Sequence, residues 1–70
     1  MTPLDKEIIK GMADHNLNIS AVAREIYLHK NTVEYHIKKV QHETGLNARK
    51  FYDLAELLLR IEAEDVARAD

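Results

Sequence analysis

The feature that most constrains the fold of this chain is a pair of short apolar patterns, in residues 19–26 and 30–44, joined by only three residues. Within each pattern the apolar side chains recur every three or four positions, as they do along one face of an α-helix. Ala23 precedes the turn by four residues, where two helices that cross steeply need a small side chain at their contact. The segment therefore predicts a helix-turn-helix, with a shared core of Val22, Ala23, Ile26, Leu28, Val33 and Ile37.

The ends of these two helices carry residues suited to their positions. Asn18 is the expected N-cap of the first helix, and either His29 or Asn31 caps the second. Gly45 follows the second helix, where a left-handed residue commonly ends a helix. The turn departs from the usual pattern, because Tyr27 occupies the position often filled by glycine. The turn must therefore avoid a positive φ angle at Tyr27 or accept strain.

Two further helices, over about residues 3–15 and 48–63, complete the predicted fold, which is all-α with four helices. The first begins with Thr2-Pro3-Leu4-Asp5, which combines an N-cap, a proline at the first helical position and a carboxylate in the first turn. We expect residues 1–61 to form one helix-turn-helix domain. The acidic residues 62–70 then extend the last helix or fray.

The last helix holds more apolar side chains than one core-facing stripe needs. A second apolar surface on so small a domain indicates a partner helix, most simply the same helix of another copy. The stripe expected to face the core is Phe51, Leu54, Leu58 and Ile61, which leaves Leu57 and Leu59 partly outside it. The predicted dimer interface comprises Leu54, Leu57, Leu58, Leu59 and Ile61.

The composition narrows the class of protein. The chain has no cysteine, which excludes disulfides and thiolate-bound zinc. No apolar run approaches the roughly 20 residues of a membrane span, so we expect a cytoplasmic protein without a membrane association. The net charge of −2 argues against a general binder of polyanions, but residues 62–70 carry −3 and the segment 27–44 carries +1. Binding to DNA would therefore depend on a few well-placed contacts.

One side of the helix over residues 30–44 is apolar, and the other carries side chains that can hydrogen-bond to bases and phosphates. This arrangement fits a helix that enters the major groove of DNA, although an ordinary solvated face has a similar composition. We expect His36 at the surface beside that face. The candidate base-reading residues are Lys30, Asn31, Glu34, Tyr35 and Lys38. The candidate phosphate-binding residues are Ser20, Thr32, Lys39, His42, Arg49 and Lys50.

The segment from His29 to Val40, followed by Thr44-Gly45-Leu46, resembles the C-terminal helix-turn-helix domain of PucR-type transcriptional regulators, which control purine catabolism and sugar-diacid use. The run from Asn47 to Leu54 is similar to the start of that family's fourth helix, and the resemblance covers residues 4–61. A second similarity is to the output domains of LuxR/NarL-type response regulators.

Both resemblances imply a DNA-binding domain whose helix at 30–44 enters the major groove, and the LuxR/NarL type also implies dimerisation through the fourth helix. This chain departs from the PucR-type pattern, which usually has arginine in place of Lys30 and His36, and often a basic residue in place of Glu34. Without the guanidinium forks of arginine, readout of guanine and binding of phosphate are weaker.

Two functions fit these observations. The first is a transcriptional regulator that binds a specific site on double-stranded DNA as a homodimer, without a cofactor. The second is a protein–protein interaction module that uses the last helix and the acidic tail. An enzyme with a small-molecule substrate is not expected, because no nucleophile–base arrangement or glycine-rich phosphate loop is present. A metal site is not expected either, since His29, His36 and His42 are not spaced three or four residues apart.

Overall fold

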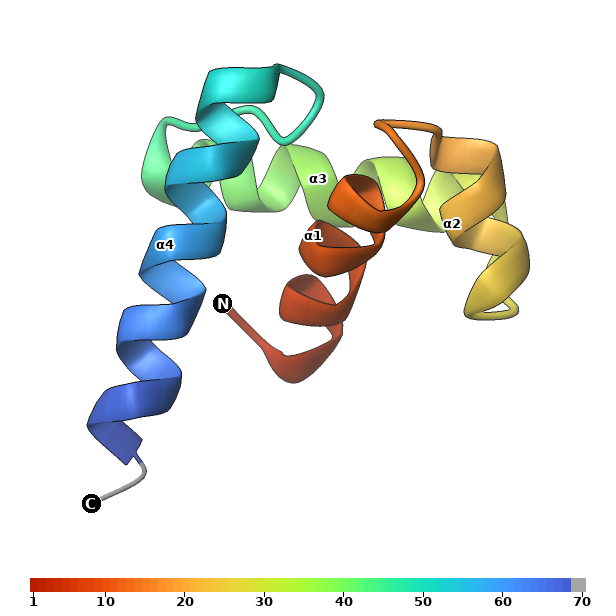
Figure 1. The fold of residues 1–70 in the computed structure, drawn as a ribbon. Helices are drawn as coiled ribbons and strands as arrows, with labels where there is room; N and C mark the ends of the chain where they lie inside the picture. The colour runs from red at the N-terminus through yellow and green to blue at the C-terminus, as the bar shows by residue number, and fades with distance from the viewer. Residues whose placement is uncertain (69–70) are drawn as a thin grey trace.

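The computed structural model describes residues 1–68, which form four α-helices (Figure 1). The helices are α1 (Pro3–Asp14), α2 (Ile19–Glu25), α3 (Lys30–Thr44) and α4 (Phe51–Arg68). The predicted all-α class and the order of four helices are confirmed. No helix in this part of the chain is long and apolar enough to cross a membrane.

The capping box predicted at the start of α1 is present. The backbone N–H of Asp5 donates to Thr2 Oγ1 (3.1 Å), and the backbone N–H of Thr2 donates to Asp5 Oδ2 (2.9 Å). After α1 ends, the chain turns through two left-handed residues, Asn16 with φ 54° and Leu17 with φ 67°. Asparagine tolerates this conformation. Leucine rarely adopts it, so the positive φ of Leu17 could not be predicted from the residue type.

The predicted caps of α2 and α3 are also in place, whereas Asn47, which the sequence suggests as the N-cap of the last helix, lies before the start of α4. Asn18 Oδ1 accepts from the N–H of Ala21 (3.1 Å) at the start of α2. His29 Nδ1 accepts from the N–H of Asn31 (3.0 Å), so His29 rather than Asn31 caps α3. Gly45 ends α3 with φ 77°, in the left-handed region that glycine adopts without strain.

α1 lies at the centre of the molecule and packs on each of the other three helices. In Figure 1, α3 passes behind α1, with α2 near one end of α3 and α4 near the other. The expected core of the helix-turn-helix is formed, with Ile26 and Leu28 packed at its edge. The buried apolar side chains are Ile8, Ile9, Met12, Ile19, Val22, Ala23, Val33, Ile37, Val40, Ala48, Leu54, Leu57 and Ile61.

Gly11 allows α2 to approach α1 closely. A Cβ atom at this position would lie 3.1 Å from Cγ1 of Val22, which is itself buried. Glycine inside a helix costs about 1 kcal/mol relative to alanine. Gly11 therefore costs helix stability but allows Val22 of α2 to pack directly on the backbone of α1.

The backbone of the turn between α2 and α3 is strained at Tyr27, which is the second of the two alternatives given for this residue above. Tyr27 has φ 57°, and its side chain is 94% exposed. The N–H of Leu28 donates to the carbonyl of Ala23 (3.0 Å), which closes the turn around the left-handed residue.

The bounds and the orientation of the last helix differ from the prediction. Residues 47–50 form a turn, in which Asn47 Oδ1 accepts from the N–H of Arg49 (2.9 Å), so α4 begins at Phe51. Phe51 was expected in the core and is 68% exposed, whereas Leu57 was expected partly outside it and is fully buried. The reason is a rotation of α4 that directs the stripe of Leu54, Leu57 and Ile61 toward α1.

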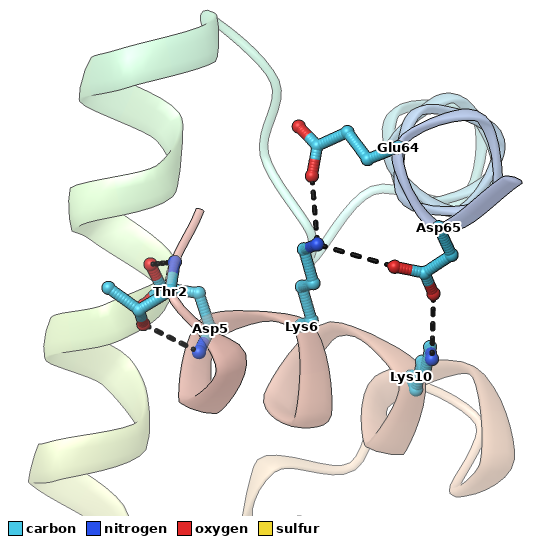
Figure 2. A network of polar contacts seen from close by, with 6 residues as sticks. All are labelled: Thr2, Asp5, Lys6, Lys10, Glu64 and Asp65. Atoms are coloured by element: carbon cyan, nitrogen blue, oxygen red, sulfur yellow. Dashed lines mark hydrogen bonds and ion pairs between the residues drawn. The ribbon is translucent and has the colours of Figure 1, made fainter. Parts of the chain in front are cut away.

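The helical structure continues through most of the acidic tail, since α4 reaches Arg68; residues 69 and 70 lie outside the described residues. Figure 2 shows the contacts that join this part of α4 to α1. Lys6 Nζ contacts Glu64 Oε2 (3.0 Å) and Asp65 Oδ1 (3.4 Å), and Lys10 Nζ lies 3.7 Å from Asp65 Oδ2. The two lysines of α1 therefore hold two carboxylates of the tail.

Candidate nucleic-acid interface

The outer face of α3 carries a continuous polar stripe. Its four side chains, Asn31, Tyr35, Lys38 and His42, are exposed and follow one another at intervals of four, three and four residues, so they share one side of the helix. The opposite side is formed by Val33, Ile37 and Val40, which are buried. The buried side fixes the rotation of α3, and the polar stripe therefore points away from the rest of the domain.

The other two candidate base-reading residues flank this stripe. Lys30 is the first residue of α3 and is exposed, whereas Glu34 is half-buried. Positions 30, 34 and 38 lie four residues apart, so Glu34 lies between two lysines along the helix. The five candidates thus occupy one side of α3, with Glu34 at its edge.

The candidate phosphate-binding residues surround that side. Ser20 is exposed in the first turn of α2, and Thr32 is half-buried in the first turn of α3. Arg49 and Lys50 are exposed in the turn before α4, which follows the C-terminal end of α3. Within residues 1–68, Lys30, Lys38, Arg49 and Lys50 form no ion pair.

Lys39 differs from the other candidates because it is already bound within the domain. Its Nζ lies 2.9 Å from Asp5 Oδ2, and the other carboxylate oxygen of Asp5 bonds to His36 Nδ1 (2.8 Å). His36 was expected at the surface beside the polar face, but its side chain is only 16% exposed. The correction follows from the depth of Asp5, whose carboxylate is fully buried and needs donors.

The Asp5 carboxylate is ionised in spite of its burial. Burial by itself raises the pKa of a carboxyl group, but hydrogen bonds from the Thr2 backbone, His36 and Lys39 outweigh this effect and lower the pKa of Asp5 from 3.8 to about 2. The same contact raises the pKa of Lys39. An ionised carboxylate only accepts hydrogen bonds, so His36 Nδ1 is the donor.

Of the features near α3, the contacts of Asp5 with His36 and Lys39 are the hardest to predict from the sequence. Asp5 is recognisable as a capping residue, and that role explains its position without any further partner. Its two partners on α3 are 31 and 34 positions away along the chain. The only local sign is that His36 and Lys39 are three residues apart and so lie on one side of a helix.

The predicted dimer interface is only partly at the surface. Leu54, Leu57 and Ile61 belong to the core, because α4 packs this stripe against α1, so their assignment to a dimer contact is corrected. Leu58 is half-buried, and Leu59 is 61% exposed. Two further exposed apolar residues, Tyr52 and Val66, lie seven positions on either side of Leu59.

Within the described part of the chain, no group of three or more histidine or acidic side chains could hold a metal ion. His15 pairs with Glu25 between α1 and α2, and His29 caps α3. These two histidines therefore have structural partners.

The fold agrees with a comparison with known families. The model of the PucR C-terminal helix-turn-helix domain matches residues 7–63, which is most of this chain. Searches of curated proteins and of solved structures found no match. The family match includes α2, the turn at Tyr27 and the whole of α3. The chain therefore belongs to the family of PucR C-terminal helix-turn-helix domains.

Proposed function

We propose that this domain belongs to a transcriptional regulator and binds a specific site on double-stranded DNA by placing α3 in the major groove. The observation that carries the proposal is the polar stripe of α3, which faces away from the domain while the opposite side is buried. Domains of this family are generally the DNA-binding parts of regulators, and the family is not a class of enzymes. Such a role places the protein in the cytoplasm with the DNA.

The residues around the stripe have distinct proposed roles. Asn31 and Tyr35 offer groups that hydrogen-bond to base edges, and Glu34 can accept from the N4 amine of cytosine. Lys30 and Lys38 add positive charge to the same face. The proposed contacts to the phosphate backbone are Thr32 and His42 on α3 and, outside it, Ser20, Arg49 and Lys50.

The test uses a DNA site selected by the wild-type domain from a random duplex library. We expect the double variant Lys30→Ala/Lys38→Ala to bind this site with lower affinity. The slope of log K against log salt should also become less steep, by about 0.9 for each phosphate that the variant no longer neutralises. The control is Lys10→Ala/Arg60→Ala, which removes the same charge from α1 and α4. Equal effects of the two pairs, or failure to select any site, would contradict the proposal.

We further propose that two copies associate through the outer face of α4. Tyr52, Leu59 and Val66 recur every seven residues, which is the spacing of one equivalent position in successive heptads of two packed helices. Association would double the number of contacts with DNA and so compensate for the low charge of one reading helix. It requires the two α3 helices to lie about 34 Å apart, so that they can enter successive major grooves.

The seam is tested by Leu59→Ser in sedimentation equilibrium, with Tyr35→Ser as the matched control. The two side chains are almost equally exposed, at 61% and 63%, but only Leu59 lies on the proposed seam. We expect Leu59→Ser to be monomeric at concentrations where the wild type and Tyr35→Ser form dimers. A monomeric wild type would exclude the homodimer.

The alternative of an interaction module that docks through its acidic tail has less support. Glu64 and Asp65 contact Lys6 and Lys10 of α1, so two carboxylates of the tail already have partners within the domain.

A further inference from the structure

The Asp5 carboxylate joins the N-terminal end of α1 to α3. It accepts from the backbone N–H of Thr2 (2.9 Å), from His36 Nδ1 (2.8 Å) and from Lys39 Nζ (2.9 Å). Asp5 has no exposed surface, so water cannot replace any of these donors without movement of a helix. The group is the main polar contact between α1 and α3.

The two donors on α3 engage different oxygens of this carboxylate. His36 bonds to Oδ1 and Lys39 to Oδ2, and the two residues lie on adjacent turns of α3. A two-point contact of this kind resists both rotation of α3 about its axis and sliding of α3 along α1. Apolar packing by Val33, Ile37 and Val40 is less directional, because dispersion contacts tolerate small shifts.

The adjacent lysines of α3 consequently have different surroundings. Lys38 is exposed on the outer stripe and has no ion-pair partner within residues 1–68. Lys39 is half-buried and bound to Asp5. Moving Lys39 to a phosphate would leave the buried carboxylate short of a donor, which is strongly unfavourable.

We propose that Asp5 is a positioning residue for the reading helix: through His36 and Lys39 it sets the orientation of α3, and it withdraws Lys39 from contact with DNA. This inference rests on the proposed DNA-binding function, and it removes Lys39 from the phosphate-binding set that the sequence suggested.

The first experiment compares salt dependence for two adjacent single substitutions. Lys38→Ala is expected to lower the slope of log K against log salt by about 0.9, whereas Lys39→Met, which keeps an apolar stem of similar shape, leaves the slope unchanged. Asp5→Asn frees Lys39 and is expected to steepen the slope. An equal reduction of the slope in Lys38→Ala and Lys39→Met would overturn the proposal.

The second experiment uses the wild-type protein without DNA, so that it remains informative if the domain binds none. Long-range ¹H–¹⁵N spectra report which ring nitrogen of His36 carries a proton, and we expect a proton on Nδ1. In Lys39→Met, backbone amide shifts are expected to change along the contact of α1 with α3 and not in α4. A His36 ring without a proton on Nδ1, or shifts confined to residues next to position 39, would contradict the positioning role even if DNA binding is confirmed.

Discussion

At the scale of single residues, Tyr27 shows a conflict between backbone and side chain. A left-handed conformation costs a residue with a Cβ atom about 1–2 kcal/mol. The side chain of Tyr27 is 94% exposed and offsets little of this cost by packing. The turn is therefore maintained by its neighbours, namely the buried faces of α2 and α3.

We expect Tyr27→Gly to raise the free energy of unfolding by about 0.5–1 kcal/mol. Glycine removes the left-handed strain, and its greater freedom in the unfolded chain offsets part of this gain. Tyr27→Ala is the control, because it removes the ring and keeps the Cβ atom. Urea unfolding should show a stabilised Gly variant and an Ala variant close to the wild type; equal stabilisation of both would assign the effect to the ring.

Asp5 makes the domain sensitive to acid. A carboxyl whose pKa is lower in the folded state stabilises the fold above the pKa of the unfolded chain, and this contribution is lost as the pH falls through the folded value. For Asp5 the loss occurs between about pH 4 and pH 2 and amounts to roughly 2 kcal/mol, from a pKa lowered from 3.8 to about 2.

Asp5→Asn tests this contribution, since the amide is isosteric and does not titrate in this range. At neutral pH the variant should be less stable than the wild type, and the difference between them should shrink as the pH falls from 4 to 2. Denaturant unfolding at several pH values measures it. A difference that stays constant over this range would show that Asp5 does not lose its charge there in the folded protein.

At the scale of elements, the C-terminal part of α4 depends on ion pairs rather than on a core. From Glu62 to Ala67 every residue is exposed, and the contacts of Lys6 with Glu64 and Asp65 join this segment to α1. These carboxylates raise the pKa of Lys6, so this lysine stays charged to higher pH than a free lysine.

We expect Lys6→Met to increase amide hydrogen exchange over residues 62–67 and to leave exchange in α3 unchanged. Methionine keeps an apolar stem like that of Lys6 and removes its ammonium group. Lys10→Met should have a smaller effect, because Lys10 is exposed and has one distant partner at 3.7 Å. Equal effects of the two substitutions would indicate a general charge effect instead of a specific contact.

The helices themselves could be predicted from the sequence because their signals are local. Thr2, Asn18 and Gly45 each act within a few residues of their own position, and all three have the predicted roles. The orientation of α4 could not be derived in this way. Its leucines at 54, 57, 58 and 59 permit more than one core-facing stripe, and the packing of α1 selects among them.

At the scale of the whole molecule, the polar contacts that organise the candidate site join distant parts of the chain. The polar stripe of α3 follows from helical periodicity and could be predicted, whereas the pairing of Lys39 with Asp5 could not, since Asp5 is 34 positions away. The contact between Lys6 and Asp65 spans 59 positions. A pattern read along the sequence identifies which residues share a face, but not which of them are already bound to another helix.

The central position of α1 has a thermodynamic consequence. Asp5 and Lys6 are adjacent, yet Asp5 binds α3 and Lys6 binds α4. Within residues 1–68, the backbones of α3 and α4 do not come close to each other. Substitutions in contact are coupled, and distant ones add. In double-mutant cycles, Asp5→Asn with Lys39→Met and Lys6→Met with Glu64→Gln should therefore be non-additive, and Lys39→Met with Glu64→Gln additive. The proposed DNA-binding face of α3 and the proposed dimer seam of α4 could then vary independently in evolution, with α1 as their shared constraint.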